Sequence, residues 1–345
     1  EQTIEYEMIN LSNFVSTLME GQNVLAIQGL NFSASDSSFL MIPELITSRV
    51  FVNDLRYFAE PTPGGPNSEP YIGLVEQPVF SVAAGFYDST QSVSITTSRP
   101  TATIRYTLNG SQPTTSNGLV YTQPIQVGQT TTIRAIAFES DYVTLPSVTH
   151  SYLFVDDIIH QSSDGAPPPG WPSSWGQNVV DYGMDPRIIN WEGAEVVKDA
   201  LKAIPSLNIA IDLPHLFDPV TGIYANAYND GRDWERPASL ELINPDGSAG
   251  FQVNAGLRIR GGFSRSPQNP KHAFRLFFRG QYGDSPLEYP LAGPDATSSF
   301  KKIDLRTAQN YSWSFGGDPS NDFVTEVYNR LSQQAMGMPS TRSQW

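Results

Sequence analysis

Between positions 251 and 279, apolar and polar residues alternate more regularly than elsewhere in the chain. In the first half of this stretch, apolar residues occupy every second position: Val253, Ala255, Leu257 and Ile259. The second half repeats the pattern with His272, Phe274, Leu276 and Phe278, and Phe277 is the exception to it. A period of two is typical of a strand with one buried face, and the Gly-, Ser- and Pro-rich residues between the halves are typical of a long loop. The pattern predicts a β-hairpin with a polar second face.

That second face concentrates positive charge. The window holds six cations and no carboxylate: Arg258, Arg260, Arg265, Lys271, Arg275 and Arg279. The whole chain has a formal net charge of -14, so the sign is reversed locally. Because Arg presents a fork of donors that matches phosphate and Lys a compact charge, the cluster predicts an anion site. Alternatively, these cations pair with carboxylates of an acidic protein and form a salt-bridged sheet face without a ligand.

Helices and shorter strands flank the hairpin. Apolar spacing predicts a helix over residues 193–203, which Pro205 ends, and a helix from Ser320 or Asp318 to about Ala335, which Gly337 ends. The inner stripe of the second helix would consist of Phe323, Val324, Val327 and Leu331. Short strands are expected at 207–213 and 301–306. These elements predict an α+β domain over 191–345, preceded by a connector over 156–190.

Four motifs of this domain resemble the spore-coat protein H (CotH) family of secreted, atypical protein-kinase-like proteins. They are the RIRGG-x-SR loop, the PKHAFRL strand, the FKKIDLRTAQNYSW segment and the MGMPSTR helix end. In a kinase-like lobe, a Gly-rich turn covers the nucleotide phosphates, a strand Lys pairs with them and a helix Glu orients that Lys. The resemblance therefore implies Lys271 as the phosphate-pairing residue, Glu326 as its orienting partner, and ATP with a divalent cation as cofactors.

The same resemblance implies a phosphate-binding set and a limit to activity. The set comprises Arg258, Arg260, Gly261, Gly262, Arg265 and Arg275. The family's catalytic and metal-binding carboxylates lie in a later lobe, which this sequence does not reach, and we assign no metal ligand here. We expect a fragment cut at both ends, inactive by itself as a kinase, so whether the chain is an enzyme stays open.

Evenly spaced strands with turn signals over 77–155 predict a small β-sandwich. The run IRYTLNGSQPT, followed by Y…PI and TTIRAIAF, resembles the fibronectin-III-like module at the C-terminus of chitobiases, which implies a spacer or accessory domain. Within it, Asn109-Gly110 predicts a type I′ turn. We expect Tyr106, Tyr121 and Phe138 to be core residues rather than platforms for sugar rings.

Upstream, the pattern favours strands over residues 1–59. The segment LMEGQNVLAIQGLN resembles the closing strands of a galactose-binding-like jelly roll, which implies the C-terminal half of that roll with Val24, Leu25 and Ile27 in its core. The Pro- and Gly-rich residues that follow predict a linker over 60–76. The expected architecture is multi-domain and mainly β: a partial jelly roll, an immunoglobulin/fibronectin-III-like sandwich and an α+β kinase-like N-terminal lobe.

Composition narrows the functional classes. Only 16% of residues are charged, and Gly and Pro each number 27, which favours short strands and many turns. A pI near 4.6 argues against nucleic acid as a partner, because phosphate neutralisation needs a basic surface. No apolar run reaches the length of a membrane span. The absence of cysteine excludes disulfides but not secretion. We expect an extracellular or cell-surface bacterial protein that acts on a protein substrate or binds a surface glycan.

Two other functions stay open. Trp171 and Trp175 in the connector could stack on a sugar ring, as in a carbohydrate-binding or adhesion protein, or dock the connector against a neighbouring domain. Asp233 and Glu235 could be the paired carboxylates of a polysaccharide hydrolase, although adjacent arginines can neutralise them. An ester hydrolase would lack the G-x-S-x-G elbow.

The loop over 218–233 is the remaining candidate. It is rich in oxygen donors of the kind that calcium takes: Asp218, Asn226, Asn229, Asp230 and Asp233. No Glu closes this set at the right offset, so solvated turn residues are expected.

Overall fold

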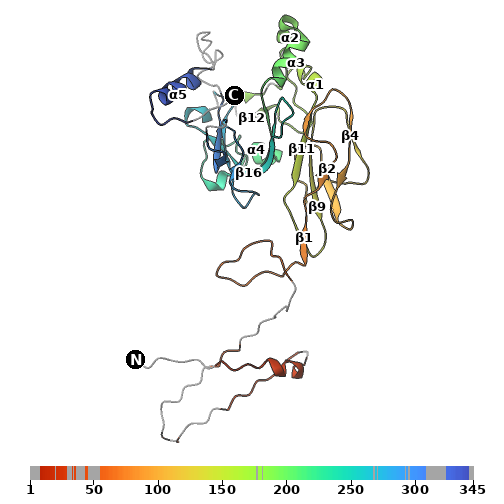
Figure 1. Cartoon of the computed structure of the whole chain (residues 1–345), viewed down its shortest axis with the longest axis vertical. Coiled ribbons are helices and arrows are strands. Elements are labelled where there is room, and N and C mark those ends of the chain that lie inside the picture. Colours follow the sequence, from red (N-terminus) through yellow and green to blue (C-terminus); the bar gives the residue numbers. More distant parts are fainter. Residues whose placement is uncertain are drawn as a thin grey trace. The chain divides into compact units, whose positions relative to one another are not determined.

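The computed structural model describes residues 8–19, 21–28, 33, 35, 43–45, 55–175, 178–180, 182–266, 269, 271–291, 293, 296–307 and 324–341. The chain divides into an N-terminal unit, residues 1–54, and a compact unit, residues 55–345 (Figure 1). All sheets found among the described residues belong to the compact unit.

The described part of the N-terminal unit has no strand. It contains a 3-10 helix, Ser12–Thr17, and Val24, Leu25 and Ile27 are 87%, 52% and 49% exposed. The prediction of a buried strand at these residues is therefore wrong. A strand buries one face only against a partner, and none of the described residues of this unit supplies one. The other predicted jelly-roll segments, at 1–7, 29–32, 36–42 and 46–54, lie outside the described residues.

The compact unit begins with the predicted β-sandwich. Its main sheet has the order β3-β11-β9-β6-β7, formed by Gly85–Phe86, Val148–Leu153, Thr131–Phe138, Thr103–Thr107 and Leu119–Val120. Three ribbons accompany it: β1 Gly73–Val75 with β10 Tyr142–Thr144, β2 Val79–Phe80 with β5 Ile95–Thr96, and β4 Gln91–Val93 with β8 Ile125–Val127. The first strand lies inside the segment predicted as linker, and its Val75 is fully buried.

The Asn109-Gly110 turn differs from the prediction. A type I′ turn needs both residues in the left-handed region, and of the two only Gly110 has a positive φ, +77°. The Asn109 Oδ1 atom instead accepts hydrogen bonds from the backbone N–H and the hydroxyl of Ser111, at 3.2 and 2.7 Å. The Gly110 carbonyl accepts one from Nη1 of Arg134, at 2.8 Å. Hydrogen bonds from the side chains of Ser111 and Arg134 thus help to set the shape of this loop. The Asn-Gly dipeptide alone does not reveal these bonds.

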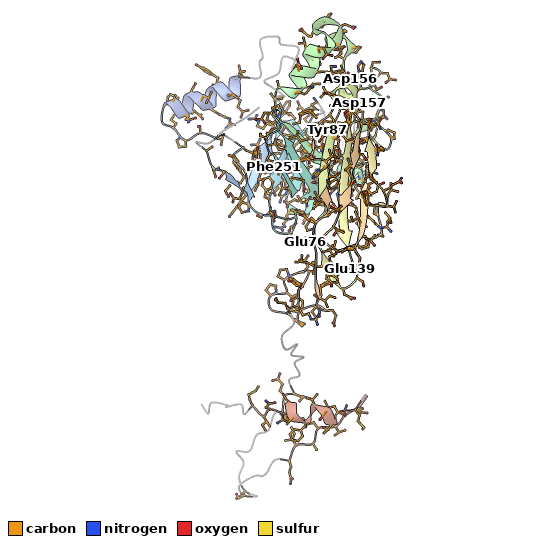
Figure 2. All side chains as sticks on the ribbon, turned by 45° about the vertical axis from the view of Figure 1, so that its right-hand side comes forward. Glu76, Tyr87, Glu139, Asp156, Asp157 and Phe251 are labelled. Atoms are coloured by element: carbon orange, nitrogen blue, oxygen red, sulfur yellow. The ribbon has the colours of Figure 1, made fainter. Side chains whose placement is uncertain are left out.

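Helices α1 Val155–Ile159, α2 Pro186–Glu192 and α3 Ala194–Lys202 follow the sandwich. Helix α3 confirms the predicted helix, and its Val197 packs with Val155 and Ile159. Nζ of Lys198 lies 3.3 Å from a carboxylate oxygen of Asp156. Figure 2 shows Asp156 at the opposite end of the sandwich from Glu139. Helix α2 was not predicted, although Asp185 is a usual N-cap and Pro186 a usual first residue of a helix.

The C-terminal sheet is antiparallel and has the order β14-β15-β16-β17-β20. Its strands are Ser206–Ala210, Arg236–Ile243, Phe251–Arg260, Ala273–Phe277 and Lys302–Leu305. Strands β16 and β17 form the predicted hairpin, and the alternating residues Val253, Ala255, Leu257 and Ile259 are all buried. Strands β14 and β20 confirm the shorter predicted strands. Hydrophobic burial on one face therefore leaves the arginines on the other.

Smaller elements complete the described unit. They are α4 Leu213–Phe217, the 3-10 turns η2 Arg232–Trp234 and η3 Phe263–Arg265, and the pairs β12 Ser174–Trp175 with β13 Asn178–Val179 and β18 Leu287–Glu288 with β19 Ser299–Phe300. Helix α5 spans Thr325–Ala335 and ends before Gly337, as predicted, with φ +70° there. Its predicted start and Phe323 lie outside the described residues. Val324 and Leu331, predicted to be buried, are each 57% exposed.

The sandwich docks onto the second face of the C-terminal sheet through polar side chains. Strand β11 contacts β15 and β16. Nδ2 of Asn208 donates to Oγ1 of Thr132 at 3.2 Å and to Oγ of Ser151, and Nδ2 of Asn254 donates to the Ser147 carbonyl at 3.2 Å. The sandwich is thus part of one compact body with the domain that follows it.

Within the described ranges, no helix combines the length and the apolar character needed to cross a membrane.

Candidate functional site

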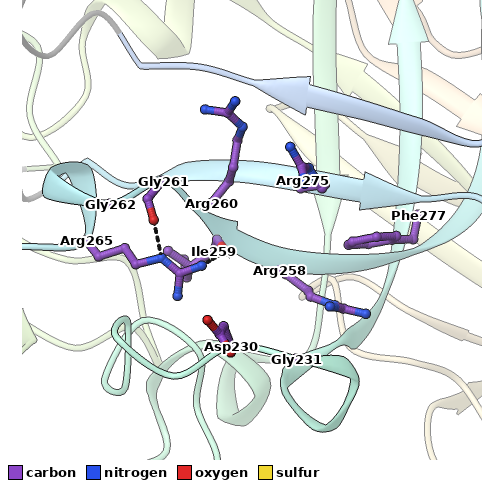
Figure 3. A pocket seen from close by; sticks show the side chains of 10 residues that line it. All are labelled: Asp230, Gly231, Arg258, Ile259, Arg260, Gly261, Gly262, Arg265, Arg275 and Phe277. Carbon is purple, nitrogen blue, oxygen red and sulfur yellow. Dashed lines mark hydrogen bonds between the residues drawn. The ribbon is translucent and has the colours of Figure 1, made fainter.

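A cavity of about 570 Å³ opens beside the Gly261-Gly262 turn at the end of the hairpin (Figure 3). It is lined by Asp230, Gly231, Arg258, Ile259, Arg260, Gly261, Gly262, Arg265, Arg275 and Phe277. All six residues of the predicted phosphate-binding set are among them. Sequence reasoning missed Asp230, Gly231 and Ile259 as lining residues. The position of Phe277 could have been predicted from the sequence. It breaks the alternation of apolar and polar residues and therefore lies on the same face of the strand as Arg275.

A row of charged residues crosses three strands at the cavity wall. Arg258 lies opposite Arg275, which lies opposite Asp304. Two like charges side by side on a sheet repel each other, so a counter-charge is needed. The Asp304 carboxylate accepts hydrogen bonds from Nε and Nη2 of Arg275, at 2.6 and 3.0 Å. Burial alone would raise the pKa of Asp304, but these bonds and the charges of Arg260 and Arg275 lower it. The carboxylate is therefore ionised at neutral pH.

Arg260 shares the same carboxylate less well. Its Nε lies 2.6 Å from Oδ2 of Asp304, yet this buried nitrogen has no hydrogen-bond partner among the described residues. The short distance makes the contact an ion pair, whereas the N–H direction does not meet the oxygen. One carboxylate thus serves two guanidinium groups and is bonded in good geometry to one of them. The Arg260 side chain is nevertheless 35% exposed and lines the cavity.

A second carboxylate, Glu235, holds the other side of the row. Its side chain is 1% exposed, and its oxygens accept from Nε and Nη2 of Arg258, at 2.9 and 2.6 Å, from Nε of Arg279 at 2.9 Å and from the Tyr282 hydroxyl at 3.1 Å. The Phe277 ring lies against both guanidinium groups, with centroid distances of 4.2 and 4.8 Å. Burial acts to raise the pKa of Glu235, but the hydrogen bonds from Arg279, Arg258 and Tyr282 lower it. Such a carboxylate orients arginines and is a poor proton donor near neutral pH.

A glycine makes room for this arrangement. A Cβ atom added at Gly256 would lie 2.5 Å from Oε1 of Glu235 and 2.6 Å from its Cγ. These distances are far below van der Waals contact, so a side chain at position 256 would displace the carboxylate. The local sequence therefore specifies the position of Glu235, and through it that of Arg258.

Arg265 fixes the Gly261-Gly262 turn. Its Nε donates to the Gly261 carbonyl at 2.6 Å, its Nη1 to those of Ala227 and Asn229 at 3.0 and 2.9 Å, and its Nη2 to that of Ile259 at 3.0 Å. Gly261 has φ +111°, which side chains rarely tolerate. Figure 3 shows Arg265 reaching from the turn towards the loop that carries Asp230. All four of these hydrogen bonds go to uncharged carbonyl groups, which do not neutralise the guanidinium group. Arg265 therefore makes the electrostatic potential of the cavity more positive.

Charge accounting at the cavity leaves an excess of cations. Five arginines (Arg258, Arg260, Arg265, Arg275 and Arg279) stand against the three carboxylates of Asp230, Glu235 and Asp304, which leaves two positive charges. The two interpretations of the sequence each describe part of this result. The arginines do gather at one cavity, and four of them do share carboxylates.

The predicted pair Lys271 and Glu326 is not among the lining residues. Lys271 is exposed, and its carbonyl accepts a hydrogen bond from the Thr307 hydroxyl at 3.4 Å. Glu326, in the first turn of α5, forms ion pairs with Arg306 and Arg330. The roles that the family resemblance implies for Lys271 and Glu326 stay predictions.

The rival sites have structural explanations. Trp171 and Trp175 pack on the Phe217 ring at centroid distances of 5.7 and 5.4 Å, so they dock the connector. The carboxylate of Asp218 accepts the N–H groups of Val220 and Thr221 at 2.9 and 2.8 Å, as expected for a turn. In the part of the chain that the structure describes, no three His, Asp or Glu side chains come together to hold a metal ion.

Comparison with known families identifies the sandwich. Residues 82–149 match the family model of the chitobiase/beta-hexosaminidase C-terminal domain. This match confirms the resemblance inferred for the second module, and such domains belong to carbohydrate-active, typically extracellular proteins. The search of curated proteins and the search of solved structures found no match to this chain.

Proposed function

We propose that the arginine-lined cavity binds phosphate groups, and that the chain is the phosphate-binding part of a secreted, atypical ATP-dependent protein kinase of the spore-coat protein H type. The observation that carries this proposal is the gathering of Arg258, Arg260, Arg265 and Arg275 around one cavity with a net excess of positive charge. The chain as a whole is acidic, so this local excess of positive charge attracts an anionic ligand to the cavity. Two of the four motifs that resemble the family, the RIRGG-x-SR loop and the PKHAFRL strand, lie on the same hairpin.

The chain's residues suit the phosphate end of a nucleotide. The Arg260 side chain lines the cavity and is 35% exposed, and Gly262 carries no side chain that would hold a ligand away from the backbone. Ile259 and Phe277 are the apolar members of the lining and could contact uncharged atoms. ATP would supply the phosphoryl group, while these side chains hold its charge and transfer no proton. We assign no residue to the divalent cation, because the described residues offer no cluster of ligands.

Calorimetric titration at low salt tests the proposal. We expect the protein to bind pyrophosphate and ATP, and Arg260→Met to weaken both at least tenfold, since a charge-assisted fork contributes about 1.5–3 kcal/mol. Arg187→Met is the matched control, because Arg187 is exposed on α2 and pairs locally with Asp185. No binding by the wild type, or equal losses in both variants, would contradict the proposal.

Lys271→Ala then separates the kinase-like part from the anion site. If Lys271 pairs with the phosphates, this variant weakens ATP binding while its unfolding temperature is unchanged. If ATP binding survives Lys271→Ala but not Arg260→Met, the cavity binds anions and the kinase-like role of Lys271 is refuted.

The family match supports a second function, an accessory domain of an extracellular carbohydrate-binding or adhesion protein. The match to residues 82–149 is its specific support. Tyr106 and Tyr121 pack against the sandwich core, with ring centroids 6.3 Å apart, so a glycan would need another surface. Pull-down on chitin and cellulose tests this function, and failure of both polysaccharides to retain the protein would count against it.

A further inference from the structure

Asp304 differs from Glu235 in how firmly it is held. Both carboxylates bridge two arginines, but the Glu235 side chain is 1% exposed and that of Asp304 is 29% exposed. Glu235 also accepts a bond from Tyr282 and fits a gap kept open by Gly256. Asp304 lies on β20, the last strand in the order of the described sheet, which is paired on one side only. Displacing the Asp304 carboxylate from its arginines should therefore cost less free energy than displacing the Glu235 carboxylate.

The arginines that Asp304 bridges are both cavity residues. Arg260 and Arg275 line the cavity, and their side chains are 35% and 38% exposed. Asp304 accepts two hydrogen bonds from Arg275, whereas the Nε–H of Arg260 does not point at the carboxylate despite a separation of 2.6 Å, so this nitrogen has no well-directed hydrogen-bond partner among the described residues. A phosphate group offers three oxygens and more charge, so it can meet both forks at once. The position between these two guanidinium groups is better suited to a phosphate than to the carboxylate that occupies it.

We propose that Asp304 is an internal competitor for the anion subsite between Arg260 and Arg275, and that a phosphate group binds there by displacing it. This inference rests on the proposed function and adds its regulation. Displacing the carboxylate costs the same free energy for every anion, so only anions that the two guanidinium groups hold strongly occupy the subsite. At a given concentration these are multiply charged ligands, such as a diphosphate or triphosphate group, rather than acetate or chloride.

Removal of the Asp304 charge tests this inference. In pyrophosphate titrations of the full chain, we expect Asp304→Asn and Asp304→Ser to bind roughly fivefold more tightly than the wild type, the size expected for a partly exposed ion pair. Asp304→Glu keeps the charge and should stay near the wild-type affinity. Asp199→Asn removes an exposed carboxylate on α3 and controls for the change in net charge. Acetate, measured in parallel, should gain by a similar factor from Asp304→Asn, because the cost of displacing Asp304 is common to every anion that binds there.

Each outcome decides between the claims. Tighter binding by both neutral variants, with Asp199→Asn unchanged, supports the competitor role. Unchanged or weaker binding by both neutral variants overturns it and shows that Asp304 holds the arginines in place, while the anion site stands if Arg260→Met still loses binding. No pyrophosphate binding by the wild type or any Asp304 variant overturns the proposed function as well.

Discussion

The buried carboxyl group of Glu241 should make the docking of the two modules depend on pH. Glu241 lies on β15 at the interface with the sandwich, is 4% exposed, and its Oε2 has no hydrogen-bond partner among the described residues. Burial raises the pKa of Glu241 to about 7, although hydrogen bonds from Ser151 act to lower it. Arg134 and Asp212 are charged groups of the same module junction. The ionised carboxylate is therefore poorly compensated where it sits.

The sign of the effect follows from proton linkage. The folded state holds the Glu241 proton more tightly than the unfolded state, in which the pKa is near 4.5. Between these two pKa values the folded state binds more protons, so the free energy of unfolding decreases as pH rises and becomes flat above about pH 7. A shift from 4.5 to about 7, at 1.36 kcal/mol per unit, corresponds to about 3 kcal/mol.

Glu241→Gln isolates this contribution, because the amide keeps the shape of the side chain and cannot ionise. Urea unfolding followed by tryptophan fluorescence, from pH 4.5 to 8, should show the variant gaining stability over the wild type as pH rises, up to about 3 kcal/mol. Glu139→Gln is the control, because the hydrogen bond from Arg99 lowers the pKa of Glu139, so Glu139 titrates below this pH range and the difference between this variant and the wild type should stay nearly constant from pH 4.5 to 8. A difference between Glu241→Gln and the wild type that does not change with pH would refute the reasoning.

Three further variants test how the site and the interface are built. Gly256→Ala should reduce the free energy of unfolding by about 1–3 kcal/mol, because its methyl group collides with Glu235, and should also weaken pyrophosphate binding; an unaffected titration would show that Glu235 does not position Arg258. Arg265→Met should cost about 2 kcal/mol and make residues 261–266 susceptible to proteolysis, whereas equal protease resistance would mean that its carbonyl contacts do not hold the turn. Asn208→Ala should cost about 1–2 kcal/mol in urea unfolding, since it removes the bonds to Thr132 and Ser151; no change would show that these bonds do not stabilise the junction.

The elements with a strict hydrophobic period were predictable from the sequence. The hairpin of β16 and β17 was predicted because burial of Leu257 and Leu276 dictates which face each residue takes. The arginine cluster followed from the same period, as the opposite face. Helix α3 followed from its apolar spacing and the terminating Pro205.

The contacts between segments distant in sequence were not predictable. Glu235 lies outside the hairpin, directly before β15 begins at Arg236. The residues next to it in the sequence do not indicate that two arginines and a tyrosine surround its carboxylate. The polar docking of the sandwich on β15 lacked a signal as well, because Ser151 and Asn208 are residue types that usually face water. In the N-terminal unit, Val24 has the spacing of a strand residue, but burial requires a partner strand that its described surroundings do not provide.

The central claim is that the cavity arginines bind phosphate directly, and NMR of arginine Nε–Hε groups during a pyrophosphate titration tests it most directly. We expect the Arg260 and Arg275 signals to shift progressively and saturate together, because both line the cavity, while the signal of Arg187 on α2 stays in place. If the Arg260 and Arg275 signals do not move, or move no more than that of Arg187, the cavity does not bind phosphate and the claim is contradicted.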